Sequence, residues 1–372
     1  MSFFKKIFSS SKEEFQEPEV LLQEESPLCP VTAVVEQDNR AAHLYLWGPE
    51  NSNFGTKSCW VRNLKPAPEK TNSREMNKGI APMLEKAYCR FPEGQSALKK
   101  EDLSFVWLEE GDGVALMEKT EIIAIIPSWS GHGGFFGYAR DAKGQESIGW
   151  ELRDTNEMHT RVSEARECWE AWDTETDPFS LHQPGMLELY EEALGKHDKY
   201  YAIDNREWPP RGLYVRNGPS KAVCVTVGLS LVPQPQVEMY VEDRMSHNRI
   251  ELGMMLNGTL SEDELDSLAS GVSGQAAIPW SNITFLGEGH TINLSIGGDH
   301  DKTAVLLTSD LSCLPILDLG VYRDSAIRLL WMIPITTKER EHIMEHGSET
   351  LIRKLNEFGD EVYSLDRAEV SF

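Results

Sequence analysis

The chain has 372 residues, of which 40% are hydrophobic and 9% are aromatic. This length exceeds the usual size of a single core, and the apolar content is too high for a disordered protein, so we expect two domains. Asp and Glu number 60 against 36 Lys and Arg, which gives a formal net charge of −24. Such a surface repels phosphate and disfavours nucleic acid and anionic membrane as partners. It favours a basic protein partner, although solubility alone also explains the acidity.

The cysteine pattern and the hydropathy indicate a cytoplasmic protein. The six cysteines are scattered without a CxxC pair, which is typical of buried thiols and not of a disulfide framework or a zinc site. No stretch is long and apolar enough to span a bilayer. The apolar residues between Met1 and Ser11 form too short and interrupted a run for a signal peptide.

The first half is predicted to hold a tail and one domain. Residues 1–28 are expected to be a flexible tail, because residues 9–28 are a Ser- and Glu-rich linker, and residues 29–195 an N-terminal α+β domain. Residues 48–79 predict a long loop, and Pro82 suits the start of a helix. Apolar patterns predict strands at 31–35, 43–47, 103–108, 114–117 and 122–126, and helices at 161–172 and 184–194.

The second half, residues 196–372, is predicted to be a separate α+β domain. Between Lys221 and Val232 large apolar residues alternate with small ones, which predicts a strand with one thick face and one small-residue face. An internal helix is the favoured cover for the small face, and a bound peptide is the alternative. Further strands are predicted at 237–241, 249–252, 292–296, 304–308 and 329–335, with a turn at 297–300.

Three short helices complete the predicted second half. Ser261 with Glu264, and Thr336 with Glu339, have the spacing of a capping box, and Gly271 and Gly347 are expected to end these two helices. A third helix is predicted to begin at Ser348. Helices and strands alternate without a regular βαβ repeat. The predicted fold is therefore α+β, with mixed, largely antiparallel sheets flanked by short helices in two lobes.

The most distinct catalytic motif is His342-Ile343-Met344-Glu345-His346. An HxxEH helix places two imidazoles and a carboxylate on one face, as in the inverted zinc peptidases, but zinc needs a third protein ligand. His346 is also explained by the negative end of the helix dipole. The prediction is a solvated helix face with no metal site, and a metal-dependent hydrolase is the alternative.

A glycine- and aromatic-rich loop over 127–141 is the other unusual segment. Gly131-His132-Gly133-Gly134 is similar to an oxyanion loop, but the nucleophile motif GxSxG and the nucleotide-binding glycine motifs are absent. Loops that combine aromatic side chains with Arg suit protein interfaces, and the alternative is that these aromatics fold inward as a small core. The partner-binding candidates are Trp129, His132, Phe135, Phe136, Tyr138, Arg140 and Asp141.

Several blocks of the second half resemble the suppressor-of-fused (SUFU) family, over roughly residues 196–358. The blocks are Trp208-Pro209-Pro210, Cys224-Val225-Thr226-Val227-Gly228-Leu229-Ser230, Arg249-Ile250-Glu251-Leu252, and Leu330-Trp331-Met332-Ile333-Pro334-Ile335-Thr336 followed by Glu339, Glu341, His346 and Gly347. The loop from Ile126 to Asp141 resembles a segment that precedes this domain in longer bacterial members.

The resemblance implies a mixed α/β domain without known catalysis. In animals the founding member is a clamp that holds a transcription factor's peptide by strand pairing, and many bacterial members are similar to immunity proteins beside toxins. We therefore predict a non-catalytic cytoplasmic protein without cofactors that binds a protein partner, such as a basic toxin or a peptide segment. A regulatory scaffold without a toxin partner is a further alternative.

Overall fold

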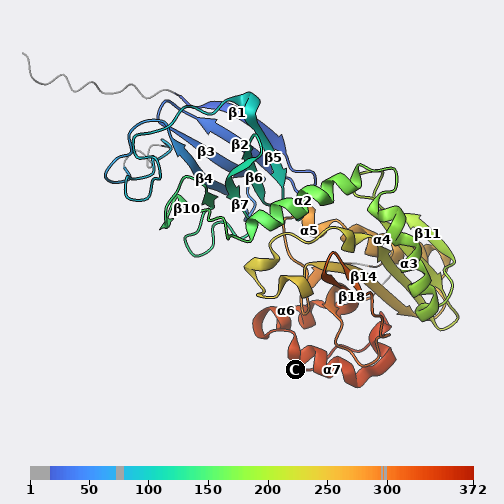
Figure 1. Cartoon of the computed structure of the whole chain (residues 1–372). Helices are drawn as coiled ribbons and strands as arrows, with labels where there is room; N and C mark the ends of the chain where they lie inside the picture. Colours follow the sequence, from blue (N-terminus) through green and yellow to red (C-terminus); the bar gives the residue numbers. More distant parts are fainter. Residues whose placement is uncertain (1–16, 73–78, 295, 297–299) are drawn as a thin grey trace, which may run out of the picture. The chain divides into compact units, whose positions relative to one another are not determined.

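The computed structural model describes residues 17–72, 79–294, 296 and 300–372. Contacts along the chain divide it into two compact units (Figure 1). The first contains the chain up to Ser26 together with Val31–Val106 and Gly113–Val162. The second contains Pro27–Pro30, Trp107–Asp112 and Ser163–Phe372, so two short segments from the first half belong to it. The predicted boundary at 195/196 remains a prediction about where an independent domain begins.

The first unit begins with a four-stranded antiparallel sheet in the order β1-β2-β3-β4. The sequence predicts a linker over residues 9–28 and a loop over 48–79, and both predictions are wrong in part, because β1 lies in the first segment and β4 in the second. Strand β4 contains polar residues that are typical of a loop, but Lys57, Arg62 and Asn63 are buried with polar partners. The strands are β1 (Glu19–Glu25), β2 (Thr32–Gln37), β3 (Ala41–Trp47) and β4 (Thr56–Asn63).

A second sheet of the first unit has the order β5-β6-β7-β8-β10-β9. The predicted strands over 103–126 are confirmed. The helix predicted from Pro82 is wrong, because the backbone there pairs elsewhere: Leu84 N donates to Asn63 Oδ1 and Lys86 N to Pro68 O. The elements are η1 (Lys100–Asp102), β5 (Leu103–Trp107), β6 (Val114–Glu118), β7 (Glu121–Ile126), β8 (Tyr138–Ala139), β9 (Gln145–Glu146) and β10 (Gly149–Glu151).

The second unit is built on one large sheet in the order β11-β12-β13-β14-β18-β16-β15, with β17 paired to β18. The β14–β18 pair is parallel, and the other pairs of this sheet are antiparallel. The strands are β11 (Lys199–Ala202), β12 (Gly212–Asn217), β13 (Lys221–Val227), β14 (Arg249–Asn257), β15 (Thr291–Asn293), β16 (Lys302–Thr308), β17 (Val321–Tyr322) and β18 (Ser325–Thr336). The turn predicted at 297–300 lies mostly outside the described residues.

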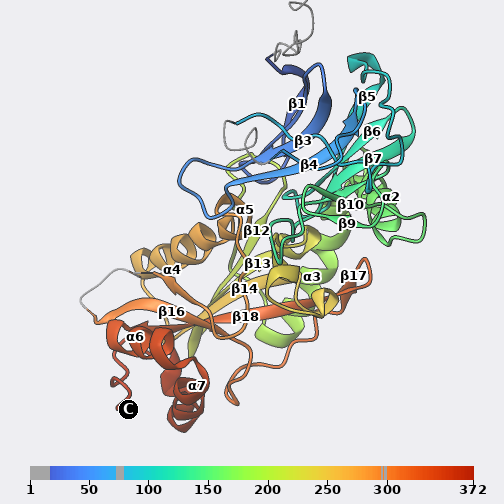
Figure 2. The same ribbon diagram turned by 90° about the vertical axis from the view of Figure 1, so that its left-hand side faces the viewer.

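Helices cover both faces of this sheet, and α3 and α4 lie on opposite sides of it (Figure 2). Val223, Val225 and Val227 of β13 form a core with α3 and α7. Because side chains alternate along a strand, the small residues of β13 point to the opposite face of the sheet, where α4 packs. The prediction that an internal helix covers this face is therefore confirmed, and α4 occupies the position that the alternative assigned to a bound peptide. The α-helices are α2 (Met158–Trp172), α3 (Pro178–Leu194), α4 (Glu262–Gln275), α5 (Ile278–Ser281), α6 (Thr337–His346) and α7 (Glu349–Leu355).

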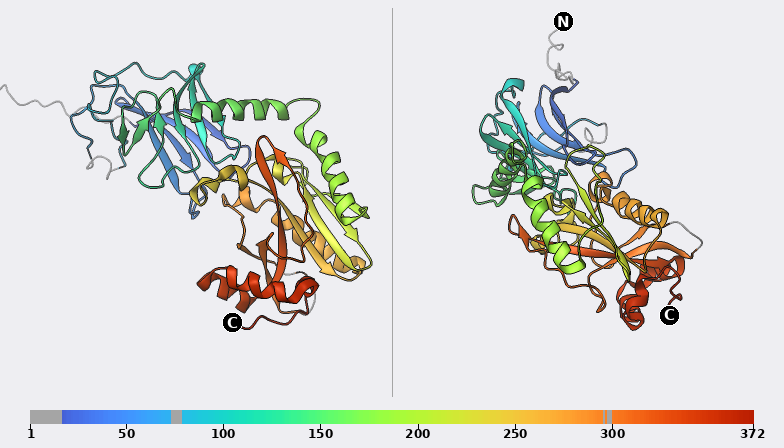
Figure 3. Two further views of the ribbon diagram at one scale, coloured as in Figure 1. Left: turned by 60° about the horizontal axis from the view of Figure 1, so that its bottom comes forward. Right: turned by 90° about the vertical axis from the view of Figure 1, so that its right-hand side faces the viewer.

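Three helices show which residues in the sequence determine where a helix begins or ends. Both capping boxes form as predicted, and α6 ends at Gly347. Helix α3 begins at Pro178 instead of Pro184, because the Asp177 carboxylate accepts the Ser180 N–H and caps the earlier proline. The predicted end of the other helix at Gly271 is wrong, because α4 continues through this glycine to Gln275. A Cβ at Gly271 would lie 3.3 Å from the Leu294 side chain. The C-terminal helices α6 and α7, in red, follow β18 (Figure 3).

The strand predicted at 237–241 is wrong. Residues Val237–Met239 form a 3-10 helix, because Gln236 has a left-handed backbone with φ of 60° and its N–H donates to Asp112. In the described part of the chain no helix has the length and hydropathy needed to cross a membrane. The other 3-10 helices of this unit are η2 (Leu229–Leu231), η4 (Arg244–Ser246) and η5 (Asn356–Tyr363). The α+β fold class is confirmed.

Candidate functional site

The loop between β7 and β8 gathers its aromatic side chains around Phe135. This ring is buried, and its centroid lies 4.8 Å from those of Tyr138 and Trp150 and 6.4 Å from that of Trp129. Such offset and tilted pairs are the favoured geometry of aromatic packing. The loop thus contains a small aromatic core, which is the alternative that the sequence left open for Phe135.

The charged residues at the end of this loop are held by ion pairs. Arg140 lies 2.7 Å from Glu121 and 3.1 Å from Asp141, and the buried Asp141 also accepts a hydrogen bond from Gln95 at 2.9 Å. Of the seven partner-binding candidates, Phe135 and Asp141 are therefore buried. His132 is exposed, and the remaining candidates Trp129, Phe136, Tyr138 and Arg140 are half-buried. The role of these five in partner binding stays a prediction.

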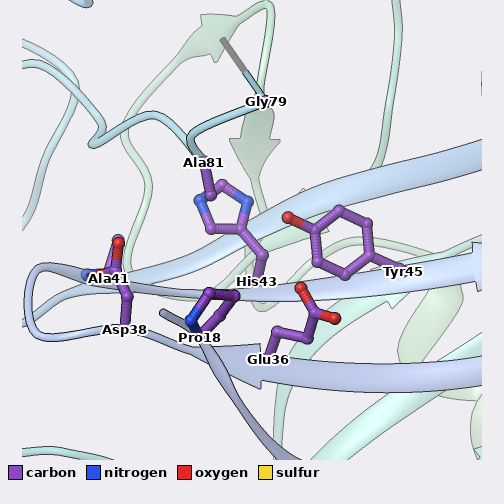
Figure 4. A pocket seen from close by; sticks show the side chains of 8 residues that line it. All are labelled: Pro18, Glu36, Asp38, Ala41, His43, Tyr45, Gly79 and Ala81. Carbon is purple, nitrogen blue, oxygen red and sulfur yellow. Dashed lines mark hydrogen bonds between the residues drawn. The ribbon is translucent and has the colours of Figure 1, made fainter. Parts of the chain in front are cut away.

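A small polar cavity of about 40 Å³ lies beside β2 and β3 (Figure 4). His43 is buried there, and its Nε2 lies 2.9 Å from Pro82 O. Burial lowers the pKa of His43 to about 4 and raises that of Tyr45 to about 12. Burial also raises the pKa of Glu36, which lies opposite His43 on β2. The cavity has room for about one water molecule, so it does not resemble a substrate site.

Lowering the pH from 7 to 4 should destabilise the first unit through His43. Its folded pKa of about 4 lies below the ordinary value of 6.5, so the neutral imidazole stabilises the fold above pH 6.5. This stability is lost as the pH falls toward 4, by about 3 kcal/mol. Urea unfolding at several pH values checks this. In His43→Gln, which does not titrate, the slope between pH 6.5 and 4 should be shallower, and an unchanged slope would exclude this role.

The HxxEH motif lies on α6. The rings of His342 and His346 are 4.8 Å apart, and His342 stacks on Phe372 with a centroid distance of 3.6 Å. Glu345 contacts His346 at 3.7 Å, and both are well exposed. Across residues 17–72, 79–294, 296 and 300–372, no cluster of three or more His, Cys, Asp or Glu has the arrangement of a metal site. The motif is thus a largely solvated helix face with one histidine covered by an aromatic ring.

The cysteines behave as the sequence predicts. All six are free thiols, and five of them are buried. Burial raises the pKa of Cys168 and of Cys224 to about 12. A thiol with such a pKa is protonated at neutral pH and is a poor nucleophile.

A buried carboxylate, that of Glu251 on β14, binds the chain where β13 ends. Glu251 accepts hydrogen bonds from Thr226 Oγ1 at 2.6 Å, from Gly228 N at 3.0 Å, and from Ser230 N and Oγ at 3.0 and 2.7 Å. Strand β13 ends here, short of the predicted Val232, because Gly228 has a left-handed φ of 98° and turns the chain into η2. Burial raises the pKa of Glu251, although these donors act against the shift.

A buried ion pair fixes the C-terminal segment. Arg367 donates through Nη1 and Nη2 to the two oxygens of Glu339, both at 2.8 Å, and neither side chain is exposed. Glu339 also accepts from Thr336 N at 2.9 Å and from Val370 N at 2.8 Å. The carboxylate that completes the α6 capping box thereby also binds the end of the chain.

A third buried charge cluster joins distant segments within the second unit. Glu109 lies 2.9 Å from Arg249 and 3.1 Å from Arg323, and Arg249 Nη1 also donates to Ser230 O. Burial raises the pKa of Glu109 in spite of the two arginines. Because Arg249 is almost fully buried, Glu109 is needed to compensate its charge. No local pattern in the sequence indicates that residues 107–112 pack here.

A groove of about 370 Å³ lies beside the middle of β18. It is bounded on one side by the strand and on the other by residues 309–317, which follow β16. Its lining is mixed, with polar and apolar surface in similar amounts, and Ile316 on the rim is 99% exposed. The lining residues are Ser309, Leu311, Ser312, Leu314, Pro315, Ile316, Leu317, Ile327, Arg328, Leu329 and Trp331. Sequence reasoning missed this site, although the apolar run from Leu311 to Leu319 was a usable signal.

Residues 210–368 match the family model described as suppressor of fused protein (SUFU). This part of the chain is a SUFU domain. The match coincides largely with residues 196–358, where the sequence resembles this family, so the recognition is confirmed. SUFU domains are of the protein-interaction type, and the family is generally regulatory and not catalytic.

Solved structures of SUFU proteins are also similar to the chain. The SUFU homolog of Neisseria gonorrhoeae FA 1090 is 18% identical with a TM-score of 0.37, over 51% of this chain and 97% of that one. A chain of the Sufu–Fu complex is 14% identical with a TM-score of 0.36, over 50% and 90%. Drosophila Suppressor of Fused is 14% identical with a TM-score of 0.28, over 45% and 44%. Among curated proteins no match was found.

The blocks that carry the SUFU resemblance have structural roles in this domain. Thr226, Gly228 and Ser230 surround Glu251, and Arg249 reaches Glu109. The closing block supplies the central strand β18 and the capping box of α6. These residues therefore support the fold of the domain.

Proposed function

We propose that this chain is a non-catalytic cytoplasmic protein whose SUFU domain binds a protein partner. The match of residues 210–368 to the SUFU family model carries this proposal. The distinctive buried polar groups of the domain are consistent with it, because Glu251 and Glu339 bind groups of the domain itself. We also propose residues 29–195 and 196–372 as the two domains.

The proposed partner is a basic protein, and the proposed role is immunity to a toxin in the producing cell. The net charge of −24 supports a basic partner through electrostatic steering. In the loop over 127–141 the accessible candidates for contact are Trp129, His132, Phe136, Tyr138 and Arg140, of which only His132 is fully exposed.

Capture of the partner from the native organism should depend strongly on salt. The tagged chain is expected to retain a basic protein at low salt and to release most of it at about 1 M salt, where charges are screened beyond about 3 Å. The captured protein should then form a stoichiometric complex with the purified chain. If it is a toxin, co-expression of the chain should restore growth.

Two results would redirect the proposal. Stoichiometric zinc in the purified chain that is lost in His342→Ala would favour a metal-dependent hydrolase built on α6. A stable partner without toxicity, together with the consistent absence of a neighbouring toxin gene, would favour a regulatory scaffold. If no basic protein is retained even at low salt, the proposed function is wrong.

A further inference from the structure

Three tryptophans of the second unit form an aromatic cluster, which we call the tryptophan surface. Trp169 and Trp172 lie three residues apart on α2, and this spacing places them on one face of the helix. Trp208 lies between β11 and β12, and the centroid of its ring is 5.6 Å from that of Trp169 and 5.3 Å from that of Trp172. Both pairs have the tilted or edge-on geometry that aromatic rings favour.

The tryptophan surface is accessible to solvent. Trp208 is 39% exposed, and Trp169 and Trp172 are half-buried. Tryptophan is highly buried on average, and it is among the residue types most enriched at the centre of protein interfaces. An exposed indole that packs on two others therefore marks a contact for a partner.

The surrounding structure holds these rings in place. Trp169 Nε1 donates to Trp107 O at 2.7 Å, which fixes the ring on α2. The loop that carries Trp208 is closed by the Asp204 carboxylate, which accepts the Arg211 N–H at 3.2 Å. The indoles are thus arranged before any partner arrives, which reduces the entropy lost on binding.

The charges around the tryptophan surface are mostly negative. Each of its tryptophans has an exposed acidic neighbour in the sequence, and these neighbours are Glu170, Asp173 and Glu207. In residues 163–176 and 204–208 together, seven acidic residues stand against two basic ones. This surface therefore attracts a cation, and it repels both nucleic-acid phosphate and a second copy of a chain with a net charge of −24.

Arginine is the cation that this chain itself places on tryptophan. Arg211 Cζ lies 4.9 Å from the ring centroid of Trp280, and Arg161 Cζ lies 5.2 Å from that of Trp129. A planar guanidinium stacks on an aromatic face and is less strongly hydrated than an ammonium group. An arginine of a partner is thus better suited than a lysine to the exposed ring of Trp208.

We propose that the tryptophan surface binds an arginine side chain of the basic partner protein. The guanidinium stacks on the Trp208 ring, and the carboxylates of Glu170, Asp173 and Glu207 stabilise its charge. This inference names a contact site for the proposed protein-binding function and rests on it.

Titration with a tetra-arginine peptide, followed by NMR at the tryptophan indole N–H signals, tests the proposal. At about 0.15 M salt, where charges are screened beyond about 8 Å, the Trp208 signal should shift the most. The signal of Trp47 should stay in place, although this indole of the first unit is equally exposed, at 40%. Tetracitrulline, which lacks the charge, should shift neither signal, and tetralysine should bind more weakly than tetra-arginine.

Variants of the full chain separate the contact from a structural role. The affinity for tetra-arginine should fall about two- to fivefold in Trp208→Ala and stay unchanged in the matched control Trp47→Ala. Trp208→Phe keeps an aromatic face and should lose less affinity than Trp208→Ala. Glu207→Gln changes only the charge at an exposed position, and it should weaken binding about twofold. If Trp208→Ala does not fold, Glu207→Gln decides.

Each other outcome overturns the tryptophan surface as the site. An unchanged affinity in Trp208→Ala, equal shifts at Trp47 and Trp208, or equal affinity for tetralysine would show a general attraction to an acidic chain. Self-association in sedimentation that Trp208→Ala abolishes would assign the surface to a second copy. If Trp208→Ala binds the captured partner like wild type, only this site is wrong. If the wild-type chain captures no basic protein, the proposed function itself is wrong.

Discussion

Replacing Glu339 by Gln will lower the free energy of unfolding of the SUFU domain by about 3 to 5 kcal/mol, the loss expected when one partner of a buried ion pair is removed. Both Glu339 oxygens accept two N–H donors each, from Arg367, Thr336 and Val370. A glutamine presents an N–H₂ group to one of these donor pairs and leaves the guanidinium charge uncompensated. Urea unfolding of the wild type and the variant measures the loss.

The control for this prediction is Glu341→Gln, which makes the same change at an exposed position of the same helix and should leave stability unchanged. Because Glu339→Gln can fail to fold, the double variant Glu339→Gln/Arg367→Met provides a second test. Its loss should be smaller than the sum of the two single losses, since it no longer buries an unpaired charge. Additive losses would show that the two side chains do not act as a pair.

Replacing Glu251 by Ala will destabilise the SUFU domain by about 3 kcal/mol or more, because it leaves buried N–H groups at Gly228 and Ser230 without an acceptor. Glu251→Gln should cost much less. Its carbonyl oxygen can accept the same N–H groups, and its amide can donate to the Thr226 hydroxyl. Equal losses in the two variants would contradict a role in accepting these bonds.

The two Glu251 variants also differ from wild type in their dependence on pH. The folded pKa of Glu251 is raised above 4.5 by burial. Its protonated form therefore stabilises the fold below pH 4.5, and this contribution is lost as the pH rises through the folded pKa. Unfolding free energies measured from pH 4.5 upward should show this fall in the wild type, and Glu251→Gln should lack it. A variant with the same fall would assign it to another group.

Local signals in the sequence predicted a large part of the fold. The capping box of Thr336 and Glu339, the alternation in β13 and the apolar run of β18 depend on neighbours within a few residues. In several places where the prediction failed, the partner lies far along the chain. The sequence predicts a loop at β4 because Lys57 has no nearby partner in the sequence, whereas its buried ammonium donates to Ser128 O, 71 residues later.

The site could be predicted only in part for the same reason. The aromatic loop is visible in the sequence, but its burial depends on Trp150 on another strand. Arg367, the ion-pair partner of Glu339, is 28 residues away in the sequence, and Glu109 and Arg249 are 140 residues apart. Strand β16 stops pairing with β18 at Thr308, which no local pattern marks.

Titration of the captured partner against the purified chain at low and at high salt is the most direct test of the proposed protein-binding function. We predict a stoichiometric complex whose affinity falls steeply as the salt concentration rises, because the net charge of −24 attracts a basic partner. An affinity that is the same at low and high salt, or the absence of any complex, would contradict this account.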